Sequence, residues 1–537
     1  MSKICLCLTA DTINRNLEIL NKYRKFADLA ELRVDCLNPD ERLYIRRFPE
    51  LARLPVILTI RRDVDGGFYT GGEGARVKLF ARGLAFANAD SRLNFAYVDI
   101  EDDLAIPSLE EAARTFGTRI IRSYHDINGS PEDISEKIRS MRRSGDEIVK
   151  VAVMANNTND VLNMYRASMN FSGFDKILIC MGHYGIYSRI LAERFGSFMS
   201  YSSALSEDDV HSAKGQLDTQ ELAELYRFRK ISKKTKVYGV IGNPLKSSVS
   251  PWFFNTIFNM EETDAVYVPF PANSFNDLLE LASELDIQGL SVTVPYKETV
   301  LSWLSGCSPA VHSIGACNTM YRSSGGWFGD NTDSSGFSAS ILAFTERKNL
   351  KRQKITIIGA GGLSRAVAAE IYRLGGKAVI LNRTVHKAKN IASQYGFRWG
   401  GLDNHGAELM YKYNDIIIQT TSVGMEGYEL SAPEDHGTSD SQEHSGTANR
   451  DFSRDPLDIY SFSGKEAVMD LIYTPPVTPF LKRAMAAGCR TINGYDMVIR
   501  QACLQYAHFT GGEIPKKLLL QLNNHLPSDK MFKEANL

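Results

Sequence analysis

The chain has 537 residues, too many for one hydrophobic core, so its length favours three or four domains. Its 62 basic and 63 acidic residues nearly cancel, which gives no electrostatic signature of binding to nucleic acid or to an anionic membrane. No apolar run approaches the roughly eighteen residues that cross a bilayer. Eight scattered cysteines without zinc-site spacing indicate reduced thiols, a cytoplasmic location and no metal site.

Short apolar runs alternate with mixed, often helical stretches through the first 205 residues. Strands that alternate with helices predict a parallel sheet, and eight such units in about 230 residues match a (β/α)8 TIM barrel. An open doubly wound sheet is the alternative, because periodicity alone does not show closure. The eight runs are 4–9, 29–35, 55–61, 95–101, 119–125, 148–154, 176–181 and 197–203.

Polar residues lie inside these runs or at their ends. Glu31 and Arg33 alternate along the second run and therefore share one side of the strand. Arg61 ends the third run, His125 ends the fifth, and Lys150 interrupts the sixth. In a barrel, side chains at the carboxyl ends of the strands converge on one site.

Lys150 and His125 predict carbonyl chemistry at that site. Burial disfavours the charge of a lysine and frees its amine as a nucleophile that forms an imine with a ketone. His125 titrates near neutrality and can shuttle the proton. Singly, each has a more common structural explanation: a strand lysine that reaches solvent, or a hydrogen-bonded core histidine. Their placement on neighbouring strand ends favours the site.

The first half resembles the type I 3-dehydroquinate dehydratases over residues 1–230. The resemblance implies that Lys150 forms the imine with the C3 ketone of 3-dehydroquinate. It also implies that His125 removes the C2 proton and helps water to leave from C1, and that Arg189 binds the substrate carboxylate. The motifs that carry it are Glu31-Leu32-Arg33-Val34-Asp35, Thr59-Ile60-Arg61, Gly66-Gly67, His125-Asp126, Lys150 in VKVAVM, Met181-Gly182, Ser188-Arg189 and Ser212 with Gly215-Gln216.

The same resemblance implies further residues that bind the substrate and order the site. Asp65 departs from the pattern, because many relatives have Glu there, and its detailed role is open. The implied substrate-binding residues are Glu31, Arg33, Arg61, Ser212 and Gln216.

A basic stretch at 222–236 predicts a solvated helix and linker that lead out of the barrel. A new strand begins at Val237, and Ser248 and Ser250 follow on an extended run that turns both hydroxyls the same way. Two aligned hydroxyls can hold a carboxylate or a polyol. Alternatively, Ser250 caps a helix that begins near Pro251, and both readings can hold together.

Three polar residues then follow at strand ends and in loops. Lys297 comes after a strand and a proline, which form a rigid exit that aims its side chain. Asn318 in GACNT and Asp333 in GDNTD supply an amide and a carboxylate. Taken alone, Lys297 would be an ordinary surface lysine and Asp333 a turn or cap residue.

Residues 355–384 form a strand–turn–helix–strand unit of about thirty residues, the context that a dinucleotide fingerprint requires. Glycines let the backbone approach a pyrophosphate, and the helix N-terminus offers free N–H groups. Ser364 stands where the third Gly or Ala is usual. The expected cofactor-binding residues of the turn are Gly359, Ala360, Gly361, Gly362 and Leu363.

The end of the second strand distinguishes between cofactors. An NAD site usually has Asp or Glu there, whereas this chain has Asn382, Arg383 and Thr384. A guanidinium suits a 2′-phosphate, so we expect NADP rather than NAD. The alternative is a structural glycine turn with a surface arginine, against which the placement of strand, helix and basic tip argues.

The second half resembles the shikimate dehydrogenases across residues 237–525, through the motifs SxSP, SVTVPYK, GACNT, GDNTD, GAGG, NRT, DLIY and GYDMVIRQA. The resemblance implies that Lys297 protonates the oxygen as hydride reaches the C3 ketone of 3-dehydroshikimate, while Asp333 orients the ammonium. Tyr473 would close over the substrate or nicotinamide, and Gly494 would line the cofactor site. The implied substrate-binding residues are Ser248, Ser250, Thr293, Asn318, Asp333 and Gln501.

These patterns predict three domains. The barrel covers 1–230, a substrate domain covers 237–338 and takes back 488–525, and a Rossmann domain covers 339–487. Residues 426–464 are rich in Ser, Asp, Glu and Gly and predict a disordered surface insertion. Tyr296, where Phe is common, and Asp496, where many bacterial relatives have glycine, are departures from the dehydrogenase pattern.

The leading hypothesis is a bifunctional enzyme that converts 3-dehydroquinate to 3-dehydroshikimate and then to shikimate with NADPH. Its partners would be these small molecules, without nucleic acid or membrane, and the sequence carries no signal for oligomeric state. A quinate dehydrogenase in the second half is one alternative. A non-catalytic ligand sensor is another, against which the presence of Lys150, His125, Lys297 and Asp333 argues.

Overall fold

The computed structural model divides the chain into two compact units, Met1–Leu290 and Ser291–Leu537. The boundary between them falls inside the strand β11 (Ile287–Val292). The residues that the structure describes are 1–85, 90–143, 145–204, 215–243, 245, 248–425 and 455–524.

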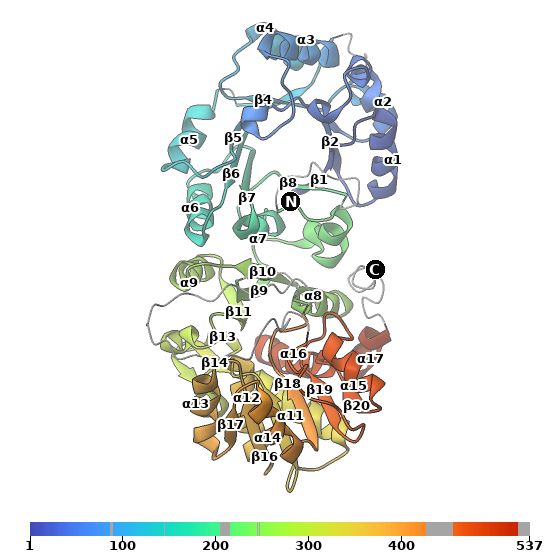
Figure 1. Cartoon of the computed structure of the whole chain (residues 1–537). Helices are drawn as coiled ribbons and strands as arrows, with labels where there is room; N and C mark the ends of the chain where they lie inside the picture. The colour runs from blue at the N-terminus through green and yellow to red at the C-terminus, as the bar shows by residue number, and fades with distance from the viewer. Residues whose placement is uncertain are drawn as a thin grey trace, which may run out of the picture. The chain divides into compact units, whose positions relative to one another are not determined.

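Eight parallel strands make up the sheet of the first unit, in the order β7-β6-β5-β4-β3-β2-β1-β8 (Figure 1). β1 pairs with both β2 and β8. At the other edge, Phe198 N donates to Lys176 O of β7 at 2.6 Å just before β8 begins, so the barrel is nearly closed. The predicted (β/α)8 barrel is confirmed. Its strands are β1 (Lys3–Leu8), β2 (Leu29–Arg33), β3 (Val56–Thr59), β4 (Tyr97–Glu101), β5 (Arg119–Asp126), β6 (Ile148–Met154), β7 (Lys176–Met181) and β8 (Met199–Ser202).

The two sides of the barrel strands bury different residues, because successive side chains alternate across a strand. Leu6 and Leu32 pack outward in the cluster beneath the helices, whereas Cys5 and Ile57 belong to the cluster that fills the interior. The helices that cover the strands are α1 (Ile13–Tyr23), α2 (Phe48–Ala52), α3 (Glu73–Leu84), α4 (Pro107–Thr115), α5 (Ile134–Met141), α6 (Thr158–Met169) and α7 (Ile186–Ile190).

The predicted helix at 222–236 is wrong. A π-helical turn ends at Leu225, and Arg227 adopts a left-handed conformation with φ 47°, which a continuous helix cannot contain. The next sheet has the order β10-β9-β11-β13-β14-β12. Its other elements are β9 (Lys236–Gly242), α8 (Ser250–Met260), β10 (Ala265–Pro271), α9 (Phe275–Glu284), β12 (Gly306–Cys307), α10 (Pro309–Ile314), β13 (Thr319–Ser323), β14 (Gly326–Asp330) and α11 (Thr332–Thr345).

A third sheet, entirely parallel, has the order β17-β16-β15-β18-β19-β20. Counted from β15, this is the strand order 3-2-1-4-5-6 of a dinucleotide-binding fold, and the order reverses beside β15. The predicted Rossmann domain is therefore confirmed. The elements are β15 (Lys354–Ile358), α12 (Gly362–Arg373), β16 (Lys377–Leu381), α13 (Val385–Tyr395), β17 (Arg398–Gly400), α14 (Asn404–Lys412), β18 (Ile416–Gln419), β19 (Ala467–Asp470), α15 (Pro479–Ala486), β20 (Arg490–Ile492), α16 (Tyr495–Thr510) and α17 (Lys516–Asn524).

The predicted disordered insertion at 426–464 is wrong in its last ten residues. Leu457 and Tyr460 are fully buried in a core cluster of the Rossmann sheet. Arg483 forms an ion pair with Asp455 at 2.9 Å. Two large apolar residues anchor a segment whose average composition is polar. Residues 426–454 lie outside the described part of the chain.

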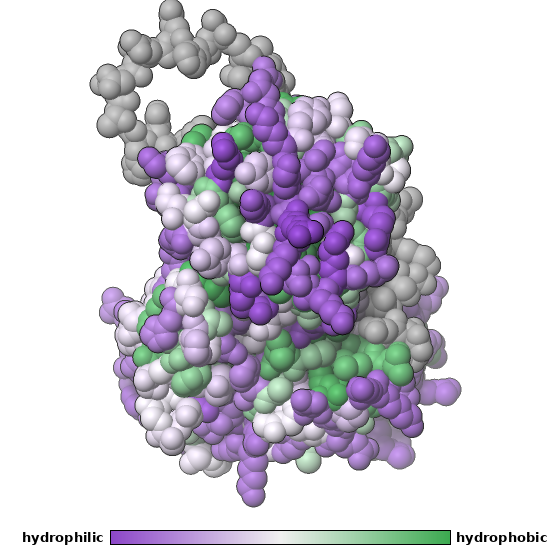
Figure 2. Space-filling view, turned by 90° about the horizontal axis from the view of Figure 1, so that it is seen from below, coloured by the Kyte–Doolittle hydropathy of each residue, from purple (hydrophilic) through white to green (hydrophobic). Residues whose placement is uncertain are grey.

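Hydrophilic side chains cover most of the face seen in Figure 2, with hydrophobic residues in smaller groups between them. Among the helices of the described residues, none combines the length and the apolar character that crossing a membrane requires. All eight cysteines fall within the described residues, and each is a free thiol.

Candidate active sites

Lys150 lies in the middle of β6 and is 4% exposed. Its Nζ is 2.8 Å from Oδ2 of Asp99 on β4 and 3.9 Å from Oε1 of Glu31 on β2, and it lies over the ring of Tyr201 at 4.3 Å. The structure thus brings the predicted Glu31 and Lys150 together. The sequence indicated the burial of Lys150 but not its partner Asp99.

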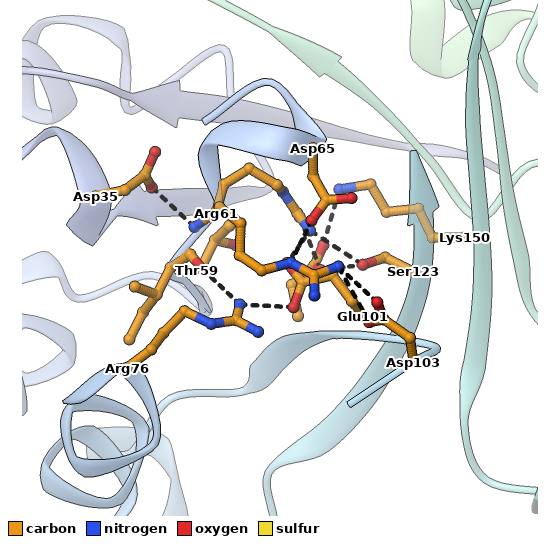
Figure 3. A network of polar contacts seen from close by, with 12 residues as sticks. Asp35, Thr59, Arg61, Asp65, Arg76, Glu101, Asp103, Ser123 and Lys150 are labelled. Atoms are coloured by element: carbon orange, nitrogen blue, oxygen red, sulfur yellow. Dashed lines mark hydrogen bonds and ion pairs between the residues drawn. The ribbon is translucent and has the colours of Figure 1, made fainter. Parts of the chain in front are cut away.

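Figure 3 shows Arg61 and Glu101 in a buried polar network beside Lys150, and Asp99 joins this network through Arg61. Arg61 Nη2 lies 2.8 Å from Asp99 Oδ1, and Arg61 Nη1 lies 2.7 Å from Glu101 Oε1. Arg76 of α3 reaches the other oxygen of Glu101 at 2.6 Å. The sequence analysis identified Arg61 but missed the other three residues. The alternation of Asp99 and Glu101 inside an apolar run was the available signal.

His125, near the end of β5, has a buried Nδ1 without a hydrogen-bond partner among the described residues. Burial lowers the pKa of His125 well below its ordinary value, and the positive charges of Arg61 and Lys150 lower it further. The imidazole is therefore neutral at neutral pH, so one of its ring nitrogens is available as a proton acceptor.

Arg33 and Asp65 are engaged by neighbouring charges. Arg33 Nη2 lies 2.7 Å from Asp35 Oδ2. Burial alone would raise the pKa of Asp35, but the pairing with Arg33 outweighs burial and lowers that pKa. Asp35 also accepts the backbone N–H of Arg61 at 3.2 Å. Asp65 pairs with Arg62 at 2.6 Å. Arg33 is thus held rigidly at the end of β2.

Arg189 differs from the other buried cations because it has no carboxylate partner among the described residues. It is 3% exposed, its Nε is unpartnered, and its Nη1 donates only to Tyr201 O at 3.4 Å. Burial lowers the pKa of Arg189 to about 10. Nearby, Gln216 Nε2 donates to Cys7 Sγ at 3.3 Å while its Oε1 is buried and unpartnered. Ser212 lies outside the described residues.

Among the described residues, the buried charges of this network do not cancel once Arg189 is included. Four buried cationic groups face four buried carboxylates, and Arg189 adds one positive charge. The half-exposed Glu73 also pairs with Arg76, at 3.0 Å. A buried, uncompensated cation favours binding of an anion. The four balanced pairs involve Arg33, Arg61, Arg76 and Lys150 against Glu31, Asp35, Asp99 and Glu101.

The second unit brings the predicted pair Lys297 and Asp333 together. Lys297 follows β11, Asp333 lies in the first turn of α11, and their Nζ and Oδ2 atoms are 2.5 Å apart. Both side chains are mostly buried but retain some exposure, 17% for Lys297 and 12% for Asp333. The ammonium is thus oriented by one carboxylate while still open to a ligand.

Asn318 and Gln501 also meet. Asn318 Oδ1 accepts the backbone N–H of Thr332 at 2.8 Å, and its Nδ2 donates to Gln501 Oε1 at 3.4 Å. One helical turn later, Gln505 donates to Asn318 O at 3.1 Å and is itself buried. The sequence analysis missed Gln505, although its i, i+4 spacing from Gln501 places both on one face of α16.

The other predicted substrate-binding residues of the dehydrogenase half lie on different elements. Thr293 follows β11, and its carbonyl accepts the N–H of Tyr296 at 2.9 Å. Tyr473 is half-buried in the loop after β19. In the first unit, Ser250 opens α8 without capping it, so the capping alternative is not observed, and Ser248 Oγ accepts its N–H at 3.3 Å. Their binding roles stay predictions.

The glycine turn lies between β15 and α12, as predicted. Gly359 has φ +113°, and a Cβ there would lie 2.5 Å from Thr420 Oγ1, so only glycine fits. A Cβ on Gly361 would meet nothing within 4 Å, which leaves space over the turn. Ser364 Oγ accepts the N–H of Gly361 at 3.1 Å and bonds to Thr420 at 2.6 Å, so this serine fastens the turn. Ala360, Gly362 and Leu363 complete the segment.

The tip after β16 presents a free guanidinium. Asn382 Nδ2 donates to Thr384 O at 3.0 Å, which shapes the tip. Arg383 is exposed and has no ion pair or hydrogen bond with described residues. Gly494 packs so closely that a Cβ would lie 2.2 Å from Leu471 O, and Asp496 pairs with Arg500 at 2.8 Å.

Family models match three stretches of the chain. Residues 4–233 match type I 3-dehydroquinase, 240–320 match the shikimate dehydrogenase substrate binding domain, and 342–426 match shikimate / quinate 5-dehydrogenase. The chain is 31% identical over 549 residues to a bifunctional 3-dehydroquinate dehydratase/shikimate dehydrogenase, chloroplastic, of Arabidopsis thaliana, covering 97% of this chain and 84% of the relative. The chain belongs to this bifunctional dehydratase/dehydrogenase family.

Two other curated proteins are similar to this chain in sequence. The shikimate biosynthesis protein AroDE of Chlamydia pneumoniae is 25% identical, with 94% of each chain covered. The shikimate dehydrogenase (NADP(+)) of Pyrococcus furiosus is 32% identical over 53% of this chain and 93% of its own. Across the described residues, no cluster of three or more His, Cys, Asp or Glu side chains could hold a metal ion.

Proposed function

We propose that this chain dehydrates 3-dehydroquinate to 3-dehydroshikimate in its barrel and reduces 3-dehydroshikimate to shikimate with NADPH in its second half. The observation that carries the proposal is Lys150, a buried lysine inside a near-closed barrel, beside a neutral histidine whose buried Nδ1 has no hydrogen-bond partner among the described residues. The family membership supports the same pair of reactions.

In the dehydratase site, Lys150 as the free amine attacks the C3 ketone, the ketone oxygen leaves as water, and a protonated imine forms. Hydrolysis of that imine after the dehydration releases 3-dehydroshikimate and restores Lys150. The imine draws electrons, so the proton at C2 becomes acidic. His125, neutral because of burial and the nearby cations, takes that proton and returns it to the hydroxyl that leaves C1 as water. Arg189, which has no carboxylate partner among the described residues, binds the substrate carboxylate in bidentate fashion. The substrate hydroxyls are held by the predicted residues Glu31, Arg33, Arg61, Ser212 and Gln216.

In the dehydrogenase site, Lys297 gives a proton to the C3 oxygen as that oxygen gains charge, and Asp333 holds the ammonium in position. Asn318 and Gln501 present amide groups to the substrate hydroxyls. NADPH, when bound, supplies the hydride. The open glycine turn and the free Arg383 fit this cofactor, since they offer backbone N–H groups to a pyrophosphate and a guanidinium to a 2′-phosphate. Tyr473 and Gly494 complete the proposed site.

The proposed barrel covers 1–230, and the proposed substrate domain covers 237–338 with the part of 488–525 that follows β20. The proposed Rossmann domain covers 339–487 and also β20 (Arg490–Ile492), because this strand pairs with β19, so the limit expected at 487 moves. The partners are the small-molecule substrates and NADP, without nucleic acid. A cytoplasmic location is supported by eight free cysteines. The Arabidopsis thaliana relative is chloroplastic by name, so fractionation of cells is the test of location.

The experiment that tests the function is Lys150→Ala in the full chain. We expect the dehydratase kcat to fall at least about 10³-fold, because the nucleophile is lost. Reduction of 3-dehydroshikimate by NADPH should stay within about twofold of wild type, because Lys150 lies in the other compact unit. Both activities are followed by absorbance.

Lys176→Ala is the matched control, because this lysine also lies in a barrel strand. Among the described residues it donates to Phe171 O and not to a carboxylate. The variant should retain dehydratase activity. Dehydration that survives in Lys150→Ala would contradict the imine mechanism.

A further inference from the structure

Asp99 is the carboxylate nearest to the Lys150 nitrogen. It lies on β4, two strands from β6, and is 1% exposed. Its Oδ2 is 2.8 Å from Lys150 Nζ, whereas Glu31 Oε1 is 3.9 Å away. The Tyr201 ring, 4.3 Å from Nζ, adds a cation–π contact. The ammonium is thus held by one strong partner and two weaker ones.

The other oxygen of Asp99 is fixed independently of Lys150. Asp99 Oδ1 lies 2.8 Å from Arg61 Nη2 and accepts the hydroxyl of Ser123 at 2.5 Å. Arg61 is itself held by Glu101, and Glu101 by Arg76 (Figure 3). Asp99 therefore cannot turn away when Lys150 changes its bonding. One oxygen faces the nucleophile and the other is anchored.

Imine formation leaves the charge on the Lys150 nitrogen unchanged. An ammonium has no lone pair, so one proton leaves before the nitrogen attacks the ketone carbon. The bond from that carbon to its oxygen then breaks, the two protons that the nitrogen has lost leave with the oxygen as water, and a protonated imine with one proton remains. The nitrogen is a cation before and after the step, so one fixed carboxylate serves both states.

We propose that Asp99 is the counter-ion that holds the Lys150 nitrogen in place, both as ammonium and as protonated imine, an inference that rests on the proposed dehydratase function. Preorganised groups of this kind stabilise charge without reorganising during the reaction. Burial alone raises the pKa of Asp99, but Arg61 and Lys150 outweigh it and hold that pKa well below its usual range. The carboxylate is consequently charged throughout the working pH range.

The test is Asp99→Asn in the full chain, with the imine trapped by borohydride during incubation with 3-dehydroquinate and located by mass spectrometry. We expect both the trapping rate and kcat to fall roughly 10²-fold, with KM within about threefold of wild type. The shape is nearly conserved, so the loss reports the charge. If Asp99→Asn traps the imine at the wild-type rate, the inference is overturned.

Glu101→Gln is the matched control, because it removes a carboxylate from the same face of the same strand without touching Lys150. It loosens Arg61, so we expect a raised KM but a trapping rate within about tenfold of wild type. An equal loss of trapping in both variants would mean that any missing negative charge has this effect, which overturns the specific role of Asp99.

Ser123→Ala keeps the test decisive if Asp99→Asn does not fold. It deletes the hydrogen bond to Asp99 Oδ1 and the one that Ser123 Oγ accepts from Arg61 Nη1 at 3.2 Å, and kcat should fall about fivefold at constant KM. An unchanged kcat would overturn the inference. Wild-type protein that traps no adduct at Lys150 would instead overturn the proposed dehydratase function, and so separates the two failures.

Discussion

At one residue of the barrel, a feature that favours substrate binding lowers the stability of the fold. Arg189 is buried without a carboxylate partner among the described residues, an arrangement that costs free energy unless an anion binds. Lys150 and Arg61 avoid that cost because Asp99 and Glu101 neutralise them. An anionic substrate would complete the charge balance at Arg189, so the imbalance that lowers stability also favours binding.

His125 predicts where the dehydratase loses activity toward acid. As the base it must be neutral, and burial with Arg61 and Lys150 lowers its pKa. The acidic limb of the kcat/KM profile should therefore lie below about 6.5, the value of an unperturbed histidine. Between the lowered pKa and about 6.5 the unfolded chain binds a proton that the folded chain does not, so stability falls toward acid in this window.

The measurement is the dehydratase kcat/KM from neutral to acidic pH, with dehydrogenase activity of the same sample recorded at each point after return to neutral pH. Full recovery shows that the limb is titration and not unfolding. An acidic limb at or above about 6.5 would mean that His125 is solvated in solution and is not buried beside two cations.

At the scale of elements, periodicity predicted the barrel strands to within a few residues and the whole β15–α12–β16 unit. What it could not supply was side-chain partners across strands. Asp99 was visible only as a polar residue in an apolar run, and its contact with Lys150 depends on barrel closure, which brings β4 and β6 to the same interior. The average composition also gave a wrong prediction of disorder at 455–464, because the burial of this segment depends on two residues, Leu457 and Tyr460.

The strand end after β16 carries a prediction about cofactor choice. Arg383 is exposed and free of partners in the described structure, at the place where a dinucleotide fold reads the ribose. Arg383→Asp should lower the ratio of kcat/KM for NADP to that for NAD by roughly 10- to 100-fold, the effect of losing a hydrogen bond to a charged group. Steady-state rates with shikimate and each cofactor measure it.

Lys387→Asp is the companion variant, because it makes the same change of charge on α13 one turn further along. Its effect on the ratio should be clearly smaller. Equal effects would assign the preference to general charge, and an unchanged ratio in Arg383→Asp would mean that the phosphate is read elsewhere.

For the whole molecule, the two lysines that carry the proposed chemistry belong to different compact units, Lys150 to Met1–Leu290 and Lys297 to Ser291–Leu537. Each has its own orienting carboxylate within its own unit, Asp99 and Asp333 respectively. Neither lysine depends on the other for its charge state. The two activities should therefore be separable by point substitution without dividing the chain.

Mixing two inactivated chains tests this independence. Lys150→Ala and Lys297→Ala, combined in equal amounts at the total protein concentration of a wild-type sample, should oxidise NADPH in the presence of 3-dehydroquinate. The final rate should be about half the wild-type rate, because each activity is present at half dose. A lag must precede it, because 3-dehydroshikimate has to leave one chain and accumulate before another binds it. A final rate far below half, because either variant has lost part of the activity that it should retain, would mean that the two lysine sites are not independent.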